Sequence, residues 1–326
     1  MSAIARGVDA ALEATVVGSF SRIGYEVRSR LEHWQAPGND LAGRTVLVTG
    51  ATSGIGLAAA SRFASLGAAV RFLARDDERA RVALAQIVEA GGPAADVSYA
   101  LADVSDFTAL REFVDGFLLA NPDLDVLVHN AGALNRDFHR APDGTELTLA
   151  AHLLGPFLLT GLLLPALRRG APGRVITVSS GGMYTQRLDL GRLEMEPGDY
   201  DGTVAYARAK RAQVVLNREW ARRVPRREVV FHAMHPGWAD TPGVRSSLPA
   251  FHRMMGPLLR TPDQGADTAV WLATAGDALE SSGTFWHDRR PRGEHRVPWT
   301  CGGSTGPDLW DLCAARTGWQ LPSATG

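Results

Sequence analysis

Tyr206 and Lys210 stand four residues apart in the run Tyr-Ala-Arg-Ala-Lys. In a helix this spacing places both side chains on one face, one turn apart. A phenol has an unperturbed pKa of about 10 and is a poor proton donor at neutral pH, and a nearby ammonium group lowers that pKa. The pair therefore suits protonation of the alkoxide that forms when a hydride reaches a carbonyl carbon. Because the spacing is common, a surface tyrosine beside a solvated lysine is the alternative.

Two further polar side chains follow predicted strands. Ser180 comes directly after an apolar run, and its hydroxyl could hold a carbonyl oxygen in place. Asn130 follows another such run, where it could brace the central strands and border a cofactor. Ligands of open α/β sheets gather at the carboxyl edge of the strands, where both residues are expected. Lys210 could in addition hydrogen-bond the ribose of a nicotinamide cofactor.

A glycine-rich turn lies near the start of the predicted sheet. A strand pattern runs into Thr-Gly-Ala-Thr-Ser-Gly-Ile-Gly at 49–56, and a helical pattern opens at once. The glycines Gly50, Gly54 and Gly56 permit a tight turn and a close approach of the backbone to a ligand. The N–H groups at the start of the helix then face an anionic pyrophosphate. The turn predicts a dinucleotide site.

Arg75 follows the second predicted strand, where a dinucleotide fold meets the adenosine ribose. NAD sites usually place a carboxylate there, whereas a guanidinium can bind a 2′-phosphate with two hydrogen bonds. Arg75 therefore favours NADP(H) over NAD(H), and a solvated arginine at the head of a helix is the alternative. Asp103, after the third predicted strand, could contact the adenine or mark the start of the next helix.

From residue 44 onward, short apolar runs alternate with longer stretches of helical periodicity. This alternation is typical of parallel strands joined by crossover helices and predicts a doubly wound α/β sheet of the Rossmann type. The predicted strands are Thr45 to Thr49, Ala69 to Ala74, Val97 to Leu101, Val126 to His129, Val175 to Ser179 and Val229 to Met234. The predicted helices lie at about 54–66, 76–90, 106–120, 146–169, 203–223 and 262–275.

A chain of 326 residues can form one large α/β domain or two small ones. No repeat or low-complexity linker marks a second domain, so a single domain is predicted. Its expected parts are a helical extension at 1–42, a catalytic domain at 43–285 and a tail at 286–326. The tail reads as loops with a short helix near Asp308 to Gln320.

Apolar residues recur at spacings of three and four in the extension and predict an amphipathic helix. They are Leu12, Val16, Phe20, Ile23, Val27, Leu31 and Trp34. Their stripe could dock on the protein's own body, on a membrane surface or on a partner subunit. No cleaved leader is expected, because the first residues lack a continuous apolar region followed by a small-residue cleavage site.

The most membrane-like stretch runs from Leu147 to Leu167 and has about the length of a spanning helix. It contains His152 together with two glycines and two prolines, so we expect a buried helix in the core or at a subunit contact.

Composition narrows the range of partners. Lys and Arg, 34 in all, nearly balance the 35 Asp and Glu, so no overall field favours nucleic acid, and a small-molecule partner is expected. Cys301 and Cys313 form neither a disulfide framework nor a metal-ligand spacing, which predicts no metal site and a reducing, cytoplasmic setting.

Taken in order, five motifs resemble those of the short-chain dehydrogenase/reductase (SDR) family over about residues 44–275. They are the turn at 49–56, Asn-Ala-Gly at 130–132, Val-Ser-Ser-Gly-Gly at 178–182, Tyr-Ala-Arg-Ala-Lys at 206–210 and His-Pro-Gly at 235–237. The resemblance implies that Ser180 and Tyr206 are catalytic, with Lys210 beside them. The implied cofactor contacts are Gly50, Thr52, Ser53, Gly54, Ile55, Gly56, Arg75, Asp103, Val104, Asn130, Ala131, Gly132, Tyr206, Lys210, Pro236, Gly237 and Thr241.

The runs at 175–183 and 234–244, together with the extension, are similar to the SDR family member twelve branch. Relatives in the wider retinol-dehydrogenase-like group act on lipophilic carbonyls or alcohols, which implies a lipophilic substrate. The segments at 180–206 and after Thr241 are expected to face each other over the substrate mouth. Their apolar side chains fit a lipophilic substrate or ordinary packing against the body.

His152 departs from the family pattern. Many members place an asparagine at the aligned position, where it holds a water that relays protons to the lysine. A neutral imidazole donates and accepts hydrogen bonds, so His152 could hold that water and add a group that titrates near neutrality. A buried structural histidine is the alternative.

The sequence thus predicts an NADP-dependent oxidoreductase that interconverts a carbonyl and an alcohol, in which His152 completes a relay behind Tyr206. The alternative is an NADP(H)-binding sensor or scaffold with little catalytic activity. Peripheral membrane contact through the extension and assembly into a homo-oligomer are left open.

Overall fold

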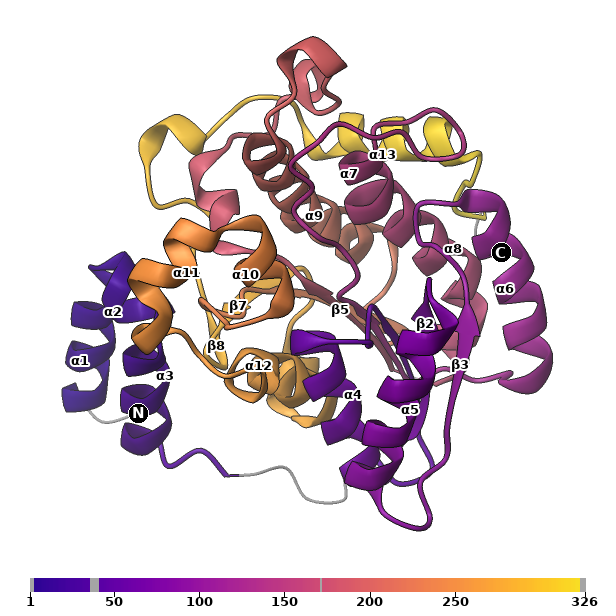
Figure 1. Cartoon of the computed structure of the whole chain (residues 1–326), viewed down its shortest axis with the longest axis horizontal. Coiled ribbons are helices and arrows are strands. Elements are labelled where there is room, and N and C mark those ends of the chain that lie inside the picture. Colours follow the sequence, from indigo (N-terminus) through magenta and orange to yellow (C-terminus); the bar gives the residue numbers. More distant parts are fainter. Residues whose placement is uncertain (1–2, 36–40, 171, 323–326) are drawn as a thin grey trace.

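A single sheet organises the chain, whose computed structural model describes residues 3–35, 41–170 and 172–322 (Figure 1). Eight strands of this described part form the sheet in the order β3-β2-β1-β4-β5-β6-β7-β8, and only the β7–β8 pair is antiparallel. The strands are β1 (Thr45–Thr49), β2 (Ala69–Ala74), β3 (Val97–Leu101), β4 (Val126–His129), β5 (Gly173–Val178), β6 (Val229–Met234), β7 (Thr284–His287) and β8 (Arg290–Pro291). Residues 1–2 and 36–40 of the predicted extension and residues 323–326 of the predicted tail lie outside the described residues.

Helices cover both faces of the sheet because its central strands are apolar on both sides (Figure 1). One face packs against α4 (Gly54–Ser65), α5 (Asp77–Gly91) and α12 (Pro262–Thr274). The other packs against α6 (Phe107–Ala120), α8 (Gly155–Arg169), α9 (Gly202–Arg223) and α13 (Gly306–Thr317). The predicted doubly wound sheet is confirmed, and the six predicted strands all form.

The tail differs from the prediction of loops with one helix. Parallel pairing of β7 with β6, from the His232–Thr284 pair to the Met234–Trp286 pair, continues the sheet. A tight turn at Asp288 and Arg289, both with positive φ, then folds β8 back against β7. The predicted boundary between 285 and 286 therefore falls inside β7. β8 has only two residues, and β7 has two apolar residues, Phe285 and Trp286, between polar ones, so neither gives the apolar run that indicated β4.

The apolar stretch at 147–169 is a composite helix. It begins as α7 (Leu147–Leu149), passes through one π turn (Ala150–Leu154) and continues as α8. Among the described residues this is the one helix long and apolar enough to cross a membrane, and 78% of its most apolar window is buried inside the protein. The prediction of a buried core helix is confirmed. The π turn holds His152, and such turns often mark functional sites.

The N-terminal extension is three helices rather than one amphipathic helix. They are α1 (Ala3–Glu13), α2 (Val16–Phe20) and α3 (Arg22–Leu31), at the left of Figure 1. Extended backbone at Thr15 and Ser21 turns the chain, and the Thr15 hydroxyl caps α2 by accepting from the Gly18 N–H.

The predicted stripe is therefore split among the three helices. Phe20 docks on the protein's own body with 4% of its surface exposed, whereas Val16, Ile23 and Leu31 remain 39–47% exposed. Of the three docking surfaces named above, the structure shows the first, since Phe20 packs on the protein's own body.

Gly155 offers a test of how closely α8 approaches the turn between β3 and α6. A Cβ at this position would lie 1.8 Å from the Val104 carbonyl oxygen, so Gly155→Ala forces backbone apart and should lower the free energy of unfolding by about 1–3 kcal/mol. The matched control is Gly116→Ala on the exposed side of α6, where no atom lies within 4 Å and helix propensity predicts a gain of about 0.5–1 kcal/mol. Urea unfolding measures both, and equal effects would contradict this packing.

Candidate active site

The glycine-rich turn lies at the carboxyl end of β1 and leads directly into α4. Gly50 and Gly54 have φ of +69° and +56°, which side chains rarely adopt. A Cβ on Gly50 would come within 2.7 Å of the Ala131 Cα, so the turn packs directly against the residues after β4. The Ser53 side chain does not cap α4, so it does not compete with a ligand for the first N–H groups of the helix. This cradle fits a pyrophosphate.

Asn130 joins the ends of β1 and β4. Its side-chain amide donates to the Thr49 and Gly50 carbonyl oxygens at 3.2 and 3.0 Å. In return, the Thr49 hydroxyl accepts the N–H groups of Asn130 and Ala131. The bracing expected of Asn130 is present, and Thr49 is a partner that the sequence analysis missed, although a threonine at the end of a buried strand was a usable signal.

Arg75 and Asp103 lie together after β2 and β3. The guanidinium is 3.5 Å from Asp103 Oδ2, and the arginine side chain is 65% exposed. The other carboxylate oxygen of Asp103 accepts from the N–H and hydroxyl of Ser105, whereas Asp106 caps α6. Arg75 is therefore free to turn toward a phosphate at the cost of one weak, solvated ion pair. Asp103 organises the turn before α6, with Val104 buried behind it.

Ser180, Tyr206 and Lys210 meet where β5 ends and α9 begins. The Lys210 Nζ lies 5.4 Å from the centre of the Tyr206 ring and donates to the Val178 carbonyl at 2.8 Å. Burial lowers the pKa of Lys210 to about 7. Burial raises the pKa of the half-buried Tyr206, and a hydrogen bond with Ser180 opposes that rise.

The expected lowering of the Tyr206 pKa by Lys210 is not found in this geometry. Desolvation disfavours the phenolate more than the neighbouring groups stabilise it. Burial also lowers the pKa of Lys210, so a smaller fraction of this lysine is charged at neutral pH. What the structure does supply is the contact of the phenol with Ser180 and its position over the lysine.

His152 lies beside this group. Its ring stands perpendicular to that of Tyr206, with centroids 5.2 Å apart, and covers Gly132, whose φ is +143°. The Nε2–H donates to the Ala133 carbonyl at 3.0 Å, which leaves Nδ1 as a buried lone pair without a partner among the described residues. Burial, and then the nearby Lys210, lower its pKa to about 3. The prediction of a group that titrates near neutrality is therefore wrong, because the fully buried imidazole stays neutral.

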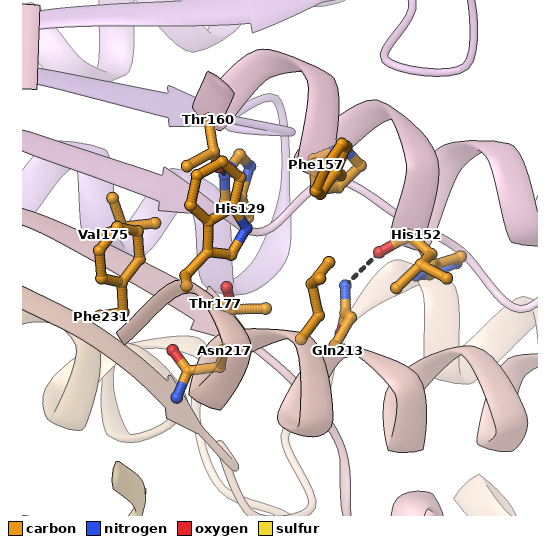
Figure 2. A pocket seen from close by; sticks show the side chains of 13 residues that line it. His129, His152, Phe157, Thr160, Val175, Thr177, Gln213, Asn217 and Phe231 are labelled. Carbon is orange, nitrogen blue, oxygen red and sulfur yellow. Dashed lines mark hydrogen bonds between the residues drawn. The ribbon is translucent and has the colours of Figure 1, made fainter. Parts of the chain in front are cut away.

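A cavity of about 20 Å³ lies behind His152, between α8, α9 and the sheet (Figure 2). Gln213 points toward His152 and donates to its carbonyl oxygen, while His129 and Thr160 pair with each other (Figure 2). Three polar atoms at this cavity have no hydrogen-bond partner in the described part of the chain: Gln213 Oε1, Asn217 Nδ2 and His129 Nδ1. The space suits a water molecule rather than an organic substrate.

The loop after β6 closes the site on its other side. Gly237 lies flat on the Arg260 guanidinium, and a Cβ there would be 2.2 Å from Arg260 Nε. Farther along, the Thr241 side chain packs on Gly54, because a Cβ on that glycine would lie 3.0 Å from Thr241 Cγ2. Pro236, Gly237 and Thr241 thus reach the same edge of the sheet as the glycine-rich turn, with Ile55 of the turn near α12.

The two segments expected over the substrate mouth both contact residues 134–136. From one side the Tyr200 hydroxyl donates to the Asn135 carbonyl, and from the other the Ser247 hydroxyl donates to the Leu134 carbonyl. Ser247 ends α10 (Pro242–Ser247), which α11 (Pro249–Met255) follows. Phe251 of α11 packs edge-on against Trp238. Among the described residues, no group of three or more His, Cys, Asp or Glu side chains is arranged to hold a metal ion.

A sequence profile described as short chain dehydrogenase matches residues 44–250. The chain belongs to the short-chain dehydrogenase/reductase family. Human dehydrogenase/reductase SDR family member 12 is 42% identical over 256 residues, which cover 78% of this chain and 80% of that protein. Mouse retinol dehydrogenase 14 is 33% identical over 291 residues, 85% of this chain and 86% of that one.

Solved structures of other proteins share the fold. A crystal structure of an uncharacterized protein from Mycobacterium paratuberculosis is 28% identical with a TM-score of 0.70, over 88% of this chain and 97% of that one. The Pseudomonas aeruginosa RhlG/NADP active-site complex is 25% identical with a TM-score of 0.62, over 77% and 96%. This SDR protein is an NAD(P)-dependent oxidoreductase that acts on CH–OH groups.

Buried histidines predict how the stability of this SDR depends on pH. Burial lowers the pKa of His129 and His152 to about 3 and of His232 and His287 to about 4. Since unfolding returns each to about 6.5, the unfolded state binds more protons below pH 6.5, and stability falls as pH drops from 6.5 toward 4. Each histidine contributes up to about 1.4 kcal/mol per pH unit.

Urea unfolding at pH 7, 6 and 5 measures this slope. The variant His152→Asn removes one group that binds a proton in the unfolded state only, so the dependence of the unfolding free energy on pH should become less steep by the contribution of one histidine. Substitution of the exposed His139 should leave this dependence unchanged. An unaltered slope in His152→Asn would mean that this imidazole is not buried neutral.

Proposed function

We propose that this SDR interconverts a carbonyl and an alcohol on a lipophilic small molecule with NADP(H), and that Tyr206 is its proton donor and acceptor. The observation that carries the proposal is the convergence of the Ser180 hydroxyl, the Tyr206 phenol and the Lys210 ammonium at the carboxyl edge of the sheet. The Ser180 hydroxyl and the Tyr206 phenol contact each other, which would let both bind one carbonyl oxygen, and the Lys210 ammonium lies behind the phenol ring.

In the direction of reduction, the bound nicotinamide supplies a hydride to the carbonyl carbon. The Ser180 hydroxyl donates a hydrogen bond to the carbonyl oxygen and holds it against Tyr206. The Tyr206 O–H then transfers its proton to the oxygen as negative charge develops there, which gives the alcohol and leaves a phenolate. Lys210 stabilises that phenolate, and its pKa of about 7 lets it take up and release a proton near neutral pH. Oxidation of the alcohol reverses each transfer.

His152 supports this group as a fixed, neutral acceptor rather than as an acid. With Nε2–H held by the Ala133 carbonyl, only the Nδ1 lone pair remains to accept a hydrogen bond, such as one from a relay water. Gln213 holds the backbone of the π turn that carries the imidazole. This arrangement does in a different geometry what an asparagine does at the aligned position in many family members.

Arg75 supports NADP(H) over NAD(H). Its exposed guanidinium lies directly after β2, and the carboxylate of the next residue, Asp76, is engaged as the cap of α5, where it accepts the Arg79 N–H. The retinol dehydrogenase names among the relatives, with the apolar side chains of α11, support a lipophilic substrate. Fold neighbours from two organisms are described as NADP complexes, in line with this choice.

Replacement of Tyr206 by phenylalanine tests the proton transfer. The variant should lower turnover by about 10²–10⁴-fold, because the ring is kept but the transferable proton is lost, while the affinity for NADPH changes little. Absorbance at 340 nm follows turnover over a panel of lipophilic aldehydes and ketones. The control Tyr99→Phe removes a hydroxyl that donates to Asp77 at the far edge of the sheet and should leave turnover intact.

Undiminished turnover in Tyr206→Phe would refute this mechanism. An unmodified chain that binds NADPH tightly yet reduces no member of the panel would favour a sensor or scaffold instead.

Replacement of Arg75 by alanine tests the choice of cofactor. We expect the dissociation constant for NADPH to rise about tenfold or more and that for NADH to stay nearly constant, because only the former carries the 2′-phosphate. Quenching of tryptophan fluorescence measures both constants. Arg62→Ala, on the exposed side of α4, is the matched control. Tighter binding of NADH than of NADPH by the unmodified protein would contradict this assignment.

A further inference from the structure

Phe20, at the junction of α2 and α3, lies against both backbone segments that flank the catalytic group. The ring of this residue meets that of His235 edge-on with centroids 4.2 Å apart and meets that of Trp238 at 5.9 Å. Its backbone carbonyl accepts the Trp238 N–H at 2.8 Å. A residue far from the catalytic motifs in sequence thereby touches the loop that follows β6.

The same ring supports the segment after Ser180. A Cβ on Gly181 would lie 2.7 Å from Phe20 Cε2 and 3.0 Å from His235 Nε2, so this glycine rests directly on the two rings. Gly181 is bonded to Ser180, so the contact of Gly181 with the two rings constrains the position of the serine hydroxyl. Phe20 is thus a spacer between the serine side of the site and the loop at 235–238.

Arg260 contacts both the α2–α3 junction and the loop at 235–238. Its guanidinium donates to the carbonyl oxygens of Ser19, Phe20 and Ser21 at 2.9–3.1 Å. The same group lies under Gly237, while the Arg260 backbone pairs with Trp238 and Asp240. One buried side chain therefore holds the extension and the loop in a single unit.

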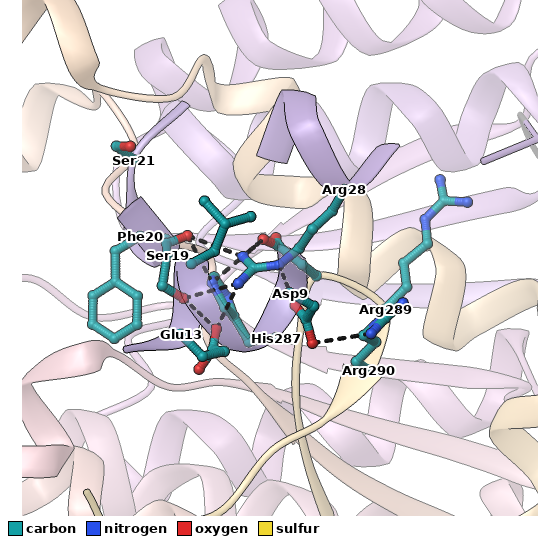
Figure 3. A network of polar contacts seen from close by, with 12 residues as sticks. Asp9, Glu13, Ser19, Phe20, Ser21, Arg28, His287, Arg289 and Arg290 are labelled. Carbon is teal, nitrogen blue, oxygen red and sulfur yellow. Dashed lines mark hydrogen bonds and ion pairs between the residues drawn. The ribbon is translucent and has the colours of Figure 1, made fainter. Parts of the chain in front are cut away.

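A chain of buried charges anchors this unit (Figure 3). Asp288 lies between two fully buried guanidinium groups, with Arg28 Nη1 and Arg260 Nη1 each 2.6 Å from a carboxylate oxygen. Arg28 also reaches Asp9 of α1 at 2.7 Å, and Asp9 pairs with Arg292 at 2.8 Å. Buried ions persist only when fully paired, so the extension can leave the body only by exposing several charges at once.

We propose that Phe20 is a positioning residue of the active site and that it acts through Ser180. The N-terminal extension then belongs to the catalytic machinery: it sets the distance between the Ser180 hydroxyl and the loop at 235–238, where substrate and nicotinamide would meet. This inference rests on the proposed function for its effect on rate, whereas its structural part is independent of any reaction.

The variants Phe20→Ala, Phe20→Leu and Phe117→Ala form the test. Phe117 is a buried ring of α6 in the core, remote from the site, and its truncation matches the loss of packing. Phe20→Ala should lower kcat at least tenfold, Phe20→Leu should recover most of the loss, and Phe117→Ala should change kcat less than twofold at temperatures where all variants are folded. Equal loss of kcat in Phe20→Ala and Phe117→Ala would overturn the proposal.

A double-mutant cycle asks whether Phe20 acts through the serine. In a Ser180→Ala background, Phe20→Ala should reduce the remaining kcat by less than threefold, because the group that it positions is already gone. The full tenfold loss in that background would contradict the coupling.

Amide hydrogen exchange provides a measurement that needs no turnover. Phe20→Ala should speed exchange in peptides that contain residues 179–186 and 235–241, and Phe117→Ala should not. Unchanged exchange in both peptides would refute the inference whatever the activity. Faster exchange together with full activity of Tyr206→Phe would instead retain the positioning role and reject the proposed chemistry.

Discussion

The hydrogen bonds between Asn130 and the end of β1 hold together the two turns on which the site is built. The Asn130 amide accounts for the Thr49 and Gly50 carbonyl groups, which the glycine-rich turn would otherwise leave without strand partners. Gly132, against which the His152 ring packs, follows Asn130 by two residues in the same turn. The hydrogen bonds of Asn130 thus support both the cofactor site and the catalytic group, so a displacement of either turn would change the geometry of both.

Much of this arrangement could be predicted from the sequence. The central strands are continuous apolar runs with polar or glycine residues at their ends, and parallel strands bring those ends to one edge, so Asn130 and Ser180 had to lie there. Spacing alone placed Lys210 under Tyr206. These inferences succeed because each depends on local periodicity and on a single topological rule.

Protonation states and long-range contacts could not be predicted in this way. The neutrality of His152 follows from its complete burial in a π turn, and the raised pKa of Tyr206 follows from desolvation, neither of which a spacing reveals. Arg260 carried no signal, because an isolated arginine before a helix reads as a solvated side chain. The extension seemed a single apolar stripe, but the contacts that hold it are mainly charged, and their partners lie more than 200 residues away.

The docking of α1–α3 sets an order for the folding of the chain. Arg28 closes its ion pair with Asp288 across 260 residues, and Phe20 packs against His235, which follows β6, and His287, which ends β7. During synthesis the extension leaves the ribosome before the surface that binds it, so Arg28 and Phe20 lack these partners until residues 235–288 have been made. The extension can therefore dock only after β6 and β7 have been synthesised, later than β1 to β5 can pair. With the role proposed for Phe20, the active site is complete only after that docking.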